Sequence, residues 1–271
     1  MGLIEVGHQF SQHSLNTFAR CRRRFLLRYL DRQPWPVPED VNLGEYEEHL
    51  RRGRILHEWI ARTLLGLPAG PTAASSDDAL LRKWWGRWTQ FDLSALPVLS
   101  REVELPLVVP LGPYCLYARF DLLALGPDGA AIIVDWKTLA YVPSQQTLRD
   151  RIQTRVYLYA AVAAGHVLTG GAPLAADRAA MRYWFAEEGR SEDVRYSAEA
   201  YARDARFLCN LVEEIASLPR EGFTCTGDAR QCVRCNYRSL CQRDSSSETG
   251  ADWREEDIDF ALDLDDADAD S

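Results

Sequence analysis

The middle of the chain contains the feature that most constrains its fold, a stretch in which apolar residues recur at every second position. Three runs of this kind cover residues 98–109, 114–125 and 130–137, with the short segments 110–113 and 126–129 between them. Alternating apolar residues are typical of strands, and segments rich in proline and glycine between two such runs mark tight turns. The sequence therefore predicts three consecutive antiparallel strands.

On both sides of these strands the apolar residues are spaced three and four apart, which is the spacing of amphipathic helices. The predicted helices cover residues 14–30, 43–65 and 77–88 before the strands, and 147–164 and 197–217 after them. Ser14 is the predicted N-cap of the first helix, and a further strand is predicted at 181–187. Helices and strands in this order indicate an α/β protein.

The length and composition favour a single globular domain. A chain of 271 residues, 46% of them hydrophobic, can bury one large core. Its apolar runs are shorter than the about 20 residues that span a bilayer, and residues 1–6 lack the features of a signal peptide. We therefore expect a cytoplasmic protein with no membrane partner.

Asp135 and Lys137 lie two residues apart at the end of the third predicted strand, so their side chains share one face. Asp121 lies on the preceding strand, and hairpin pairing can bring it beside Asp135. Two carboxylates supply the oxygen ligands that Mg²⁺ and Mn²⁺ prefer, and a nearby lysine can stabilise charge that develops on a phosphate. These residues are candidates for a catalytic metal site, and the alternative is an ion pair at a strand end.

Two of the predicted helices carry further candidates. His57 lies within the helix at 43–65, while Gln153 and Tyr157 lie four residues apart on one face of the helix at 147–164. A histidine can be a metal ligand. Taken singly, these residues are more typical of an amphipathic helix without a site.

The cysteines indicate a second metal site towards the C-terminal end. Cys232, Cys235 and Cys241 have two and five residues between them. Disulfides are rare in cytosolic proteins, so closely spaced thiols favour metal binding. Cys225 is close in sequence and would complete a zinc site of four cysteines, whereas Cys21, the other candidate, lies near the opposite end of the sequence.

The order of these candidates along the chain resembles the motif order of a known family, the RecB-like branch of the PD-(D/E)XK nuclease superfamily. The matching motifs are Gly53-x-x-x-His57, Asp121, Asp135-x-Lys137 and Gln153-x-x-x-Tyr157. The resemblance implies that Asp121, Asp135 and His57 bind Mg²⁺ or Mn²⁺ and that Lys137 is the catalytic lysine. It also implies that Gln153 and Tyr157 contact DNA or orient the site.

The cysteines extend the resemblance to iron–sulfur nucleases, among them the AddB-type recombination nucleases and the CRISPR spacer-acquisition nucleases. Cys21 stands before a basic and aromatic helix, and the late triplet has a similar spacing. The resemblance implies a [4Fe–4S] cluster on Cys21, Cys232, Cys235 and Cys241. Structural Zn²⁺ is the alternative, and Cys225 is the competing fourth ligand. Such a cluster would fasten the two ends of the domain together.

The fold implied by the resemblance is α/β, a restriction-endonuclease-like core whose central mixed sheet is flanked by helices. A helical N-terminal arm and a C-terminal iron–sulfur segment complete it, and Glu104 or Glu102 would be an accessory acidic residue. The expected organisation is one nuclease domain over residues 1–247, made of the arm (1–97), the core (98–218) and the cysteine segment (219–247), followed by an acidic, disordered tail over 248–271.

The formal net charge of −9 resides in this tail. Residues 252–271 contain ten acidic residues and one basic residue, and the rest of the chain is neutral. Arginines cluster at positions 20–28 and 51–54, which is compatible with binding of phosphates. The tail is expected to be a solubilising segment, and the alternative is that it mimics nucleic acid and covers a basic surface.

The residues and the resemblance together predict a metal-dependent DNA nuclease, and the resemblance implies action on single strands or DNA ends in repair, recombination or defence. Its expected partners are DNA and a helicase or another repair or defence protein, since the chain lacks the phosphate loop of a helicase motor. One alternative is a catalytically idle DNA-binding scaffold subunit of a repair or spacer-integration complex. Another is a zinc-ribbon protein without nuclease activity.

Overall fold

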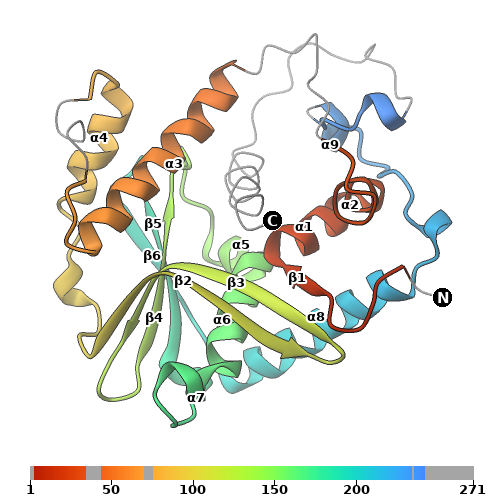
Figure 1. Cartoon of the computed structure of the whole chain (residues 1–271). Helices are drawn as coiled ribbons and strands as arrows, with labels where there is room; N and C mark the ends of the chain where they lie inside the picture. The colour runs from red at the N-terminus through yellow and green to blue at the C-terminus, as the bar shows by residue number, and fades with distance from the viewer. Residues whose placement is uncertain (1–2, 35–43, 70–75, 234, 242–271) are drawn as a thin grey trace.

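The computed structural model describes residues 3–34, 44–69, 76–233 and 235–241 (Figure 1). The acidic tail predicted over 248–271 lies outside the described residues. Within the described part of the chain, no helix is both long enough and apolar enough to cross a membrane.

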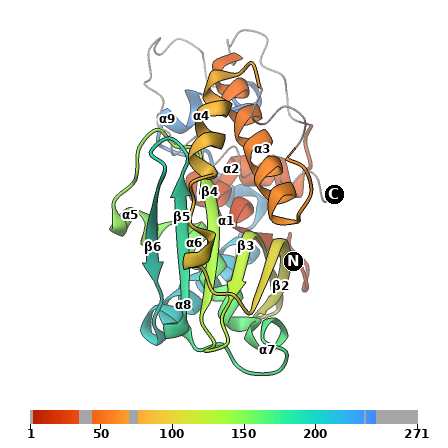
Figure 2. The same ribbon diagram turned by 90° about the vertical axis from the view of Figure 1, so that its left-hand side faces the viewer.

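A six-stranded mixed sheet forms the centre of the described structure (Figures 1 and 2). The strands are β1 (Gln9–Ser11), β2 (Ser100–Leu111), β3 (Tyr114–Leu125), β4 (Ala131–Lys137), β5 (Ala179–Phe185) and β6 (Arg190–Arg195). Their order is β1-β3-β4-β5-β6, and β2 pairs with the other edge of β3. β2, β3 and β4 are antiparallel neighbours, which confirms the predicted hairpins, while β4 and β5 run parallel.

β3 changes its neighbour along one edge. Residues 115–117 pair with β1 in parallel orientation, and residues 122–125 pair with β4 in antiparallel orientation. Asp121 lies directly before the stretch that pairs with β4. The sheet therefore opens beside Asp121, where its side chain can reach the end of β4.

β2 borders the sheet, since among the described strands it pairs only with β3. Pro110 of β2 is paired with Cys115, whose N–H donates to the carbonyl of His8 (3.0 Å) and so points away from β2. In an antiparallel ladder such pairs alternate with hydrogen-bonded ones. Pro106 and Pro110 therefore occupy positions whose N–H would face outward, and proline has no N–H to offer there.

Helices cover both faces of the sheet (Figures 1 and 2). The α-helices are α1 (Gln12–Arg20), α2 (Arg22–Phe25), α3 (Gly44–Leu64), α4 (Ala79–Trp88), α5 (Gln145–Asp150), α6 (Ile152–Ala163), α7 (Gly165–Leu168), α8 (Ala198–Ser217) and α9 (Arg230–Val233), with a π-helical turn η1 (Leu26–Leu30) after α2 and short 3-10 helices at Leu93–Ala95, Ala176–Arg178, Arg220–Gly222 and Ser239–Cys241. This α/β arrangement, a mixed sheet between two helical layers, confirms the predicted restriction-endonuclease-like fold class.

Two apolar clusters separate the helices from the sheet. The cluster beneath α3 and α4 is rich in tryptophan and includes Trp59, Trp84, Trp88, Trp136 and Trp184. The cluster on the other face joins α1, α6 and α8 to β3 and β5. Val134 and Trp136 of β4 belong to the tryptophan cluster, so by alternation Asp135 and Lys137 face α1 and α6.

The prediction of one continuous helix over 14–30 is wrong. The backbone of Cys21 is extended (φ −158°, ψ 109°), which ends α1 and begins α2. Ser14 is not the N-cap of α1 either. Ser11 is the N-cap: its hydroxyl accepts from Ser14 N (3.2 Å), and the Ser14 hydroxyl accepts from Ser11 N (2.9 Å). This reciprocal capping box fixes the start of α1.

Two other predictions differ from the structure. The helix predicted over 147–164 divides at Arg151 (φ −59°, ψ 136°) into α5 and α6. β1 and β6 have no counterpart among the predicted strands. β1 has three residues, and β6 is polar except for Val194, so neither shows the apolar alternation by which strands are predicted.

Candidate active site

Asp121 lies where β3 leaves β1 and meets β4. The β3–β4 register ends with Leu122 opposite Val134, so Asp121 and Asp135 follow as neighbours across the two strands. Asp121 Oδ2 accepts a hydrogen bond from the N–H of Trp136 (2.9 Å). At the end of β4, the carboxylate of Asp121 thus accepts the hydrogen bond that a backbone carbonyl of a neighbouring strand would otherwise accept.

Asp135 and Lys137 are buried charges on the face of β4 that α6 covers. Each is 3% exposed, and Lys137 Nζ lies 3.0 Å from Asp135 Oδ2. The ammonium also lies 5.9 Å from the centre of the Tyr183 ring on β5. Buried charges are costly unless they are paired, and their burial strengthens each charge–charge interaction because water is excluded.

α6 provides a second support for Asp135. Gln153 Nε2 donates to Asp135 Oδ1 (2.7 Å). One turn later the Tyr157 ring packs edge-on against Phe120, with 5.1 Å between the ring centroids. Phe120 directly precedes Asp121, so α6 contacts both strands that carry a carboxylate. Gln153 and Tyr157 are themselves buried, at 6% and 5% exposed.

His57 reaches the site from α3, on the opposite face of the sheet. Its Nε2 lies 2.7 Å from the carbonyl oxygen of Trp136, and its Nδ1 lies 3.5 Å from Asp121 Oδ2. Burial alone would lower the pKa of His57, but the charges of Asp121, Glu104 and Asp135 outweigh burial and raise the pKa to about 10. The ring is therefore a cation at neutral pH while no metal is bound.

The contact with His57 also lowers the pKa of Asp121. Burial acts to raise this pKa, but the charge of His57 and the hydrogen bonds from His57 and Trp136 dominate and lower it. Asp121 is therefore ionised at neutral pH. It supplies a negative charge at the point where the sheet opens.

The structure distinguishes the two acidic residues predicted on β2. Glu104 falls opposite Asp121 in the β2–β3 register, and its charge acts on His57. Its backbone has a φ of +51°, a costly conformation for a residue other than glycine and one that clusters at functional sites. Its carboxylate lies 3.4 Å from Arg119 Nε. Glu102 is exposed, so Glu104 is the acidic residue of β2 that belongs to this group.

The donor chemistry of the group suits a divalent cation such as Mg²⁺ or Mn²⁺, because carboxylate oxygens are the ligands these ions prefer. As the side chains stand, no three His, Cys, Asp or Glu among the described residues are placed to hold a metal ion. The carboxylate oxygens of the candidate site face protein groups instead. Asp121 Oδ2 faces His57, and the Asp135 oxygens face Gln153 and Lys137. A metal ion would compete with these three side chains for the same oxygens.

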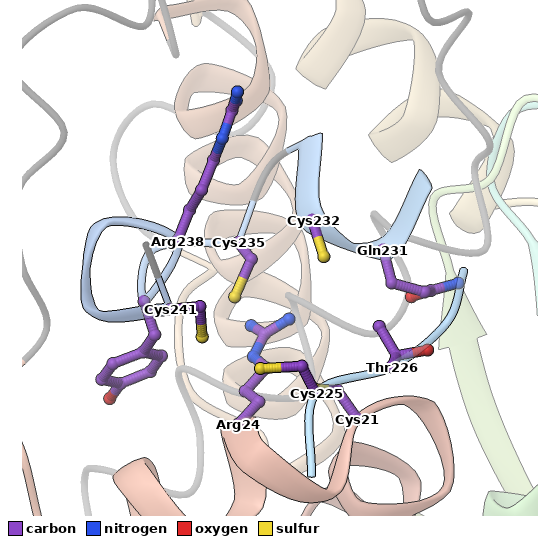
Figure 3. Close-up of a pocket in the computed structure, with 10 residues that line it drawn as sticks. Cys21, Arg24, Cys225, Thr226, Gln231, Cys232, Cys235, Arg238 and Cys241 are labelled. Atoms are coloured by element: carbon purple, nitrogen blue, oxygen red, sulfur yellow. The ribbon is translucent and has the colours of Figure 1, made fainter. Parts of the chain in front are cut away.

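A pocket beside the C-terminal end of α1 collects five of the seven cysteines (Figure 3). Its cysteines are Cys21, which follows α1, and Cys225, Cys232, Cys235 and Cys241 from the C-terminal segment. The four predicted cluster ligands therefore line one pocket, and the competing Cys225 lines it too. The remaining cysteines, on β3 and α8, do not line it.

The described thiols of this pocket share one lining but, as they stand, no three of them are placed to hold a metal ion. Burial raises the pKa of Cys235, and burial together with the neighbouring Cys225 thiol raises the pKa of Cys241 to about 12. These thiols are therefore protonated in the metal-free protein, and metal binding has to displace the protons. Four thiolates fit a [4Fe–4S] cluster, and they fit Zn²⁺ as well.

Three residues near the site were missed by the sequence motifs. Tyr183 of β5 stands opposite Asp135, and its hydroxyl shares a hydrogen bond with Thr154 of α6 (2.6 Å). Burial beside Asp135 raises the pKa of Tyr183. Gln12 of α1 donates from Nε2 to the hydroxyl of Tyr157 (3.0 Å). All three are uncharged and are positioned by contacts distant in sequence, so no local pattern marks them.

The chain is similar to one known family and, at low sequence identity, to solved structures. The family model of the PD-(D/E)XK nuclease superfamily matches residues 9–242. A solved structure of a proposed exonuclease from Eubacterium rectale is 9% identical, with a TM-score of 0.51, and the match covers 93% of this chain and 92% of that one. The crystal structure of SSO0001 is 15% identical, with a TM-score of 0.45 and 88% of each chain covered. No curated protein matches the chain.

Proposed function

This chain belongs to the PD-(D/E)XK nuclease superfamily, and from that membership we propose that it hydrolyses phosphodiester bonds of DNA with Mg²⁺ or Mn²⁺. The proposal places it in the RecB-like, iron–sulfur branch of the superfamily. Its substrates are single strands or DNA ends, met in repair, recombination or defence. A partner such as a helicase would supply unwound strands.

In this proposal Asp121, Asp135 and His57 hold the divalent cation, which when bound polarises the phosphate and activates a water. Gln153 keeps Asp135 oriented through its 2.7 Å hydrogen bond. Lys137, released from Asp135, places its ammonium on the attacking water or on the charge that develops on the phosphate. Glu104 adds negative charge beside Asp121 and strengthens the attraction for the cation.

The observation that carries the proposal is the buried pair of Asp135 and Lys137, held by Gln153 beside Asp121. A buried ion pair contributes little net stability by itself. Here it stands with a second carboxylate, a histidine whose Nδ1 lies 3.5 Å from that carboxylate and an acidic residue with a φ of +51°. Stability of the fold alone requires none of these additions, whereas a phosphodiester-cleaving metal site uses them all.

Cleavage of end-labelled single-stranded DNA tests the proposal. Anaerobically purified protein is assayed with Mg²⁺ or Mn²⁺ beside the variants Lys137→Ala and Lys83→Ala. Lys83 is the only other lysine, and its Nζ contacts Glu187 at the surface. We expect Lys137→Ala to lose about a hundredfold or more of the rate and Lys83→Ala to cut like the wild type. Binding of DNA without cleavage by any of the three proteins would instead support the idle scaffold.

We further propose that Cys21, Cys232, Cys235 and Cys241 hold the [4Fe–4S] cluster, with Cys225 as a neighbouring thiol. The shared pocket gathers these four thiols and Cys225 with them, and the choice of Cys21 rests on the family resemblance. Iron and acid-labile sulfide in anaerobically purified protein would identify the cluster, and zinc without sulfide would identify the alternative. Cys21→Ser should lose the metal and Cys225→Ser should keep it, and the reverse result would make Cys225 the fourth ligand.

A further inference from the structure

Gln12 is a buried polar residue at the first position of α1. Its side chain is only 5% exposed. The residues buried beside it on the same helix include Leu15 and Phe18, which are apolar. The capping box between Ser11 and Ser14 fixes the first turn of the helix and therefore the direction of the Gln12 side chain. A buried amide is costly unless its hydrogen bonds are made.

The amide of Gln12 is directed at the hydroxyl of Tyr157. Nε2 donates to that oxygen at 3.0 Å and lies 3.4 Å from His13 Nε2, while Oε1 has no hydrogen-bond partner among the described residues. With the amide turned over, Oε1 would accept from the Tyr157 hydroxyl instead. The contact between Gln12 and Tyr157 therefore persists in either orientation.

Tyr157 connects this contact to the two carboxylates. Its ring packs against Phe120, the residue before Asp121. One turn earlier on the same helix, Gln153 donates to Asp135. A displacement of Tyr157 would therefore disturb the strand that carries Asp121 and the helix that orients Asp135.

We infer that Gln12 is a positioning residue of the active site, which acts by fixing the hydroxyl of Tyr157 and, through it, α6 and β3. This inference rests on the proposed nuclease function and deepens it, since it makes the N-terminal arm a part of the active centre. Gln12 does not touch the reacting atoms. It restricts the positions of residues that do, and such restriction raises the rate by keeping the site in its productive geometry.

A double-mutant cycle tests this role. The proteins are the wild type, Gln12→Ala, Tyr157→Phe and the double variant, with Gln9→Ala as the matched control because Gln9 is an exposed glutamine on β1. We expect Gln12→Ala to lower kcat about tenfold, the effect of one buried hydrogen bond, while KM for DNA stays within about twofold. The double variant should lose no more than Tyr157→Phe alone, because both changes remove one contact.

Two outcomes would overturn the inference. One is a Gln12→Ala variant that cuts as fast as Gln9→Ala. The other is a double variant whose losses multiply, since Gln12 would then act independently of Tyr157. A wild type that does not cut overturns the nuclease proposal itself. The activity of the wild type therefore distinguishes failure of that proposal from failure of the inference about Gln12.

A second variant covers the case in which Gln12→Ala does not fold, as judged by circular dichroism. Gln12→Met keeps the length and volume of the side chain but removes its hydrogen bond, so we expect its kcat to fall about as far as that of Tyr157→Phe. A Gln12→Met variant that cuts as fast as Gln9→Ala would contradict the role of Gln12.

Discussion

Asp135 has a different neighbour at each carboxylate oxygen. Lys137 lies at Oδ2 and balances the charge, whereas Gln153 donates to Oδ1 and restricts the rotation of the carboxylate. The two contacts therefore have separate effects: removal of Lys137 leaves a buried charge, and removal of Gln153 leaves a charged group free to turn. A carboxylate that turns freely is a poorer metal ligand, because its lone pairs are no longer aimed.

Replacement of Gln153 should therefore appear in the metal dependence. We expect Gln153→Ala to raise the Mn²⁺ concentration for half-maximal DNA cleavage about 10- to 100-fold, the usual effect of losing a residue that supports a ligand. Gln146→Ala is the control, because Gln146 is exposed on α5 and donates to Asp150 (2.6 Å). An unchanged Mn²⁺ titration in Gln153→Ala would show that this hydrogen bond does not serve metal binding.

Charge decides which single residues can be found from the sequence. Asp135 and Lys137 stand out because two charges share one face of an apolar strand. Glu104 could not be separated from Glu102, since the distinction depends on the β2–β3 register and on a positive φ. Gln12 is neutral, and its partner Tyr157 lies far along the sequence, so periodicity carries no information about their contact.

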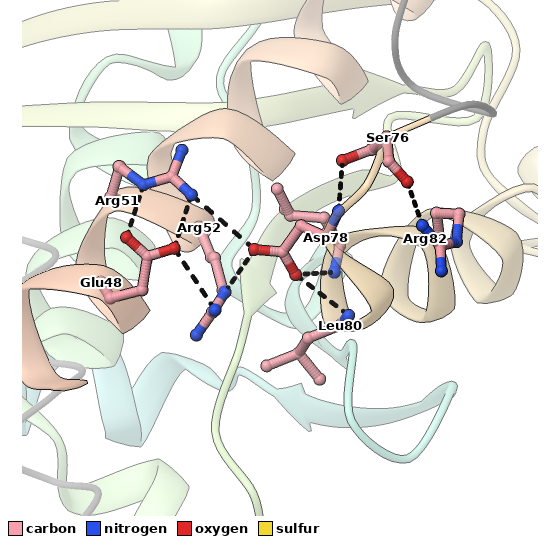
Figure 4. Close-up of polar contacts among 8 residues, drawn as sticks. Glu48, Arg51, Arg52, Ser76, Asp78, Leu80 and Arg82 are labelled. Carbon is pink, nitrogen blue, oxygen red and sulfur yellow. Dashed lines mark hydrogen bonds and ion pairs between the residues drawn. The ribbon is translucent and has the colours of Figure 1, made fainter.

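At the scale of elements, a polar network joins α3 to the start of α4 (Figure 4). Asp78 is the N-cap of α4 and accepts from Leu80 N and Leu81 N. Its Oδ2 also accepts from Arg52 Nε of α3 (2.6 Å), and Glu48 pairs with Arg51 beside it (2.5 Å). Asp78 thus fixes α4 against the helix that carries His57.

The pKa of Asp78 gives this network a pH dependence. Burial acts to raise the pKa, but the hydrogen bonds from Arg52 and from the first turn of α4 outweigh it and lower the pKa below 3.8. A carboxylate with a lowered pKa stabilises the folded state above its unfolded pKa, and the stabilisation is lost as the pH falls through the folded pKa.

Asp78→Ala should therefore lower the free energy of unfolding by about 1 kcal/mol at pH 7. The difference from the wild type should shrink below about pH 4. Urea unfolding at pH 7 and pH 3 measures both quantities, and Asp77→Ala is the control because Asp77 is exposed and adjacent. An equal difference at both pH values would mean that the charge of Asp78 is not what stabilises the junction.

An element could be predicted from the sequence when its own residues carry the signal, and could not when it depends on contacts distant in sequence. β3 and α3 are recovered with their bounds nearly unchanged, because each has a long apolar pattern that matches one period. β1 is stabilised by parallel pairing with residues 115–117, and nothing within its three residues records that pairing. The break at Cys21 was missed for the same reason, since an extended residue between two helical turns leaves the apolar spacing intact.

At the scale of the whole molecule, α1 joins the two candidate sites. Gln12 at its first position contacts Tyr157 of the active site, and Cys21 directly after it lines the cysteine pocket. A nine-residue helix is about 13 Å long and is stiff over that length. The state of the cysteine pocket should therefore affect the active site through α1.

If the cysteine pocket holds the proposed metal, its loss should loosen α1 more than the sheet. We expect amide hydrogen exchange in α1 and in residues 225–233 to speed up by tenfold or more in Cys21→Ser, about 1.4 kcal/mol of lost protection. Exchange in β4 and β5 should change little. Cys115→Ser is the control, because Cys115 does not line the pocket. Equal acceleration in β4 and α1 would indicate global destabilisation and no local role of the pocket.

The outer edge of β2 bears on how copies of this protein meet one another. A long border strand with free donors and acceptors is a template on which a second chain can add its own strand, and such addition begins fibrils. Pro106 and Pro110 leave two gaps in the row of donors along that border. An approaching strand could form no continuous ladder there. The two prolines therefore disfavour edge-to-edge pairing between the β2 strands of two copies.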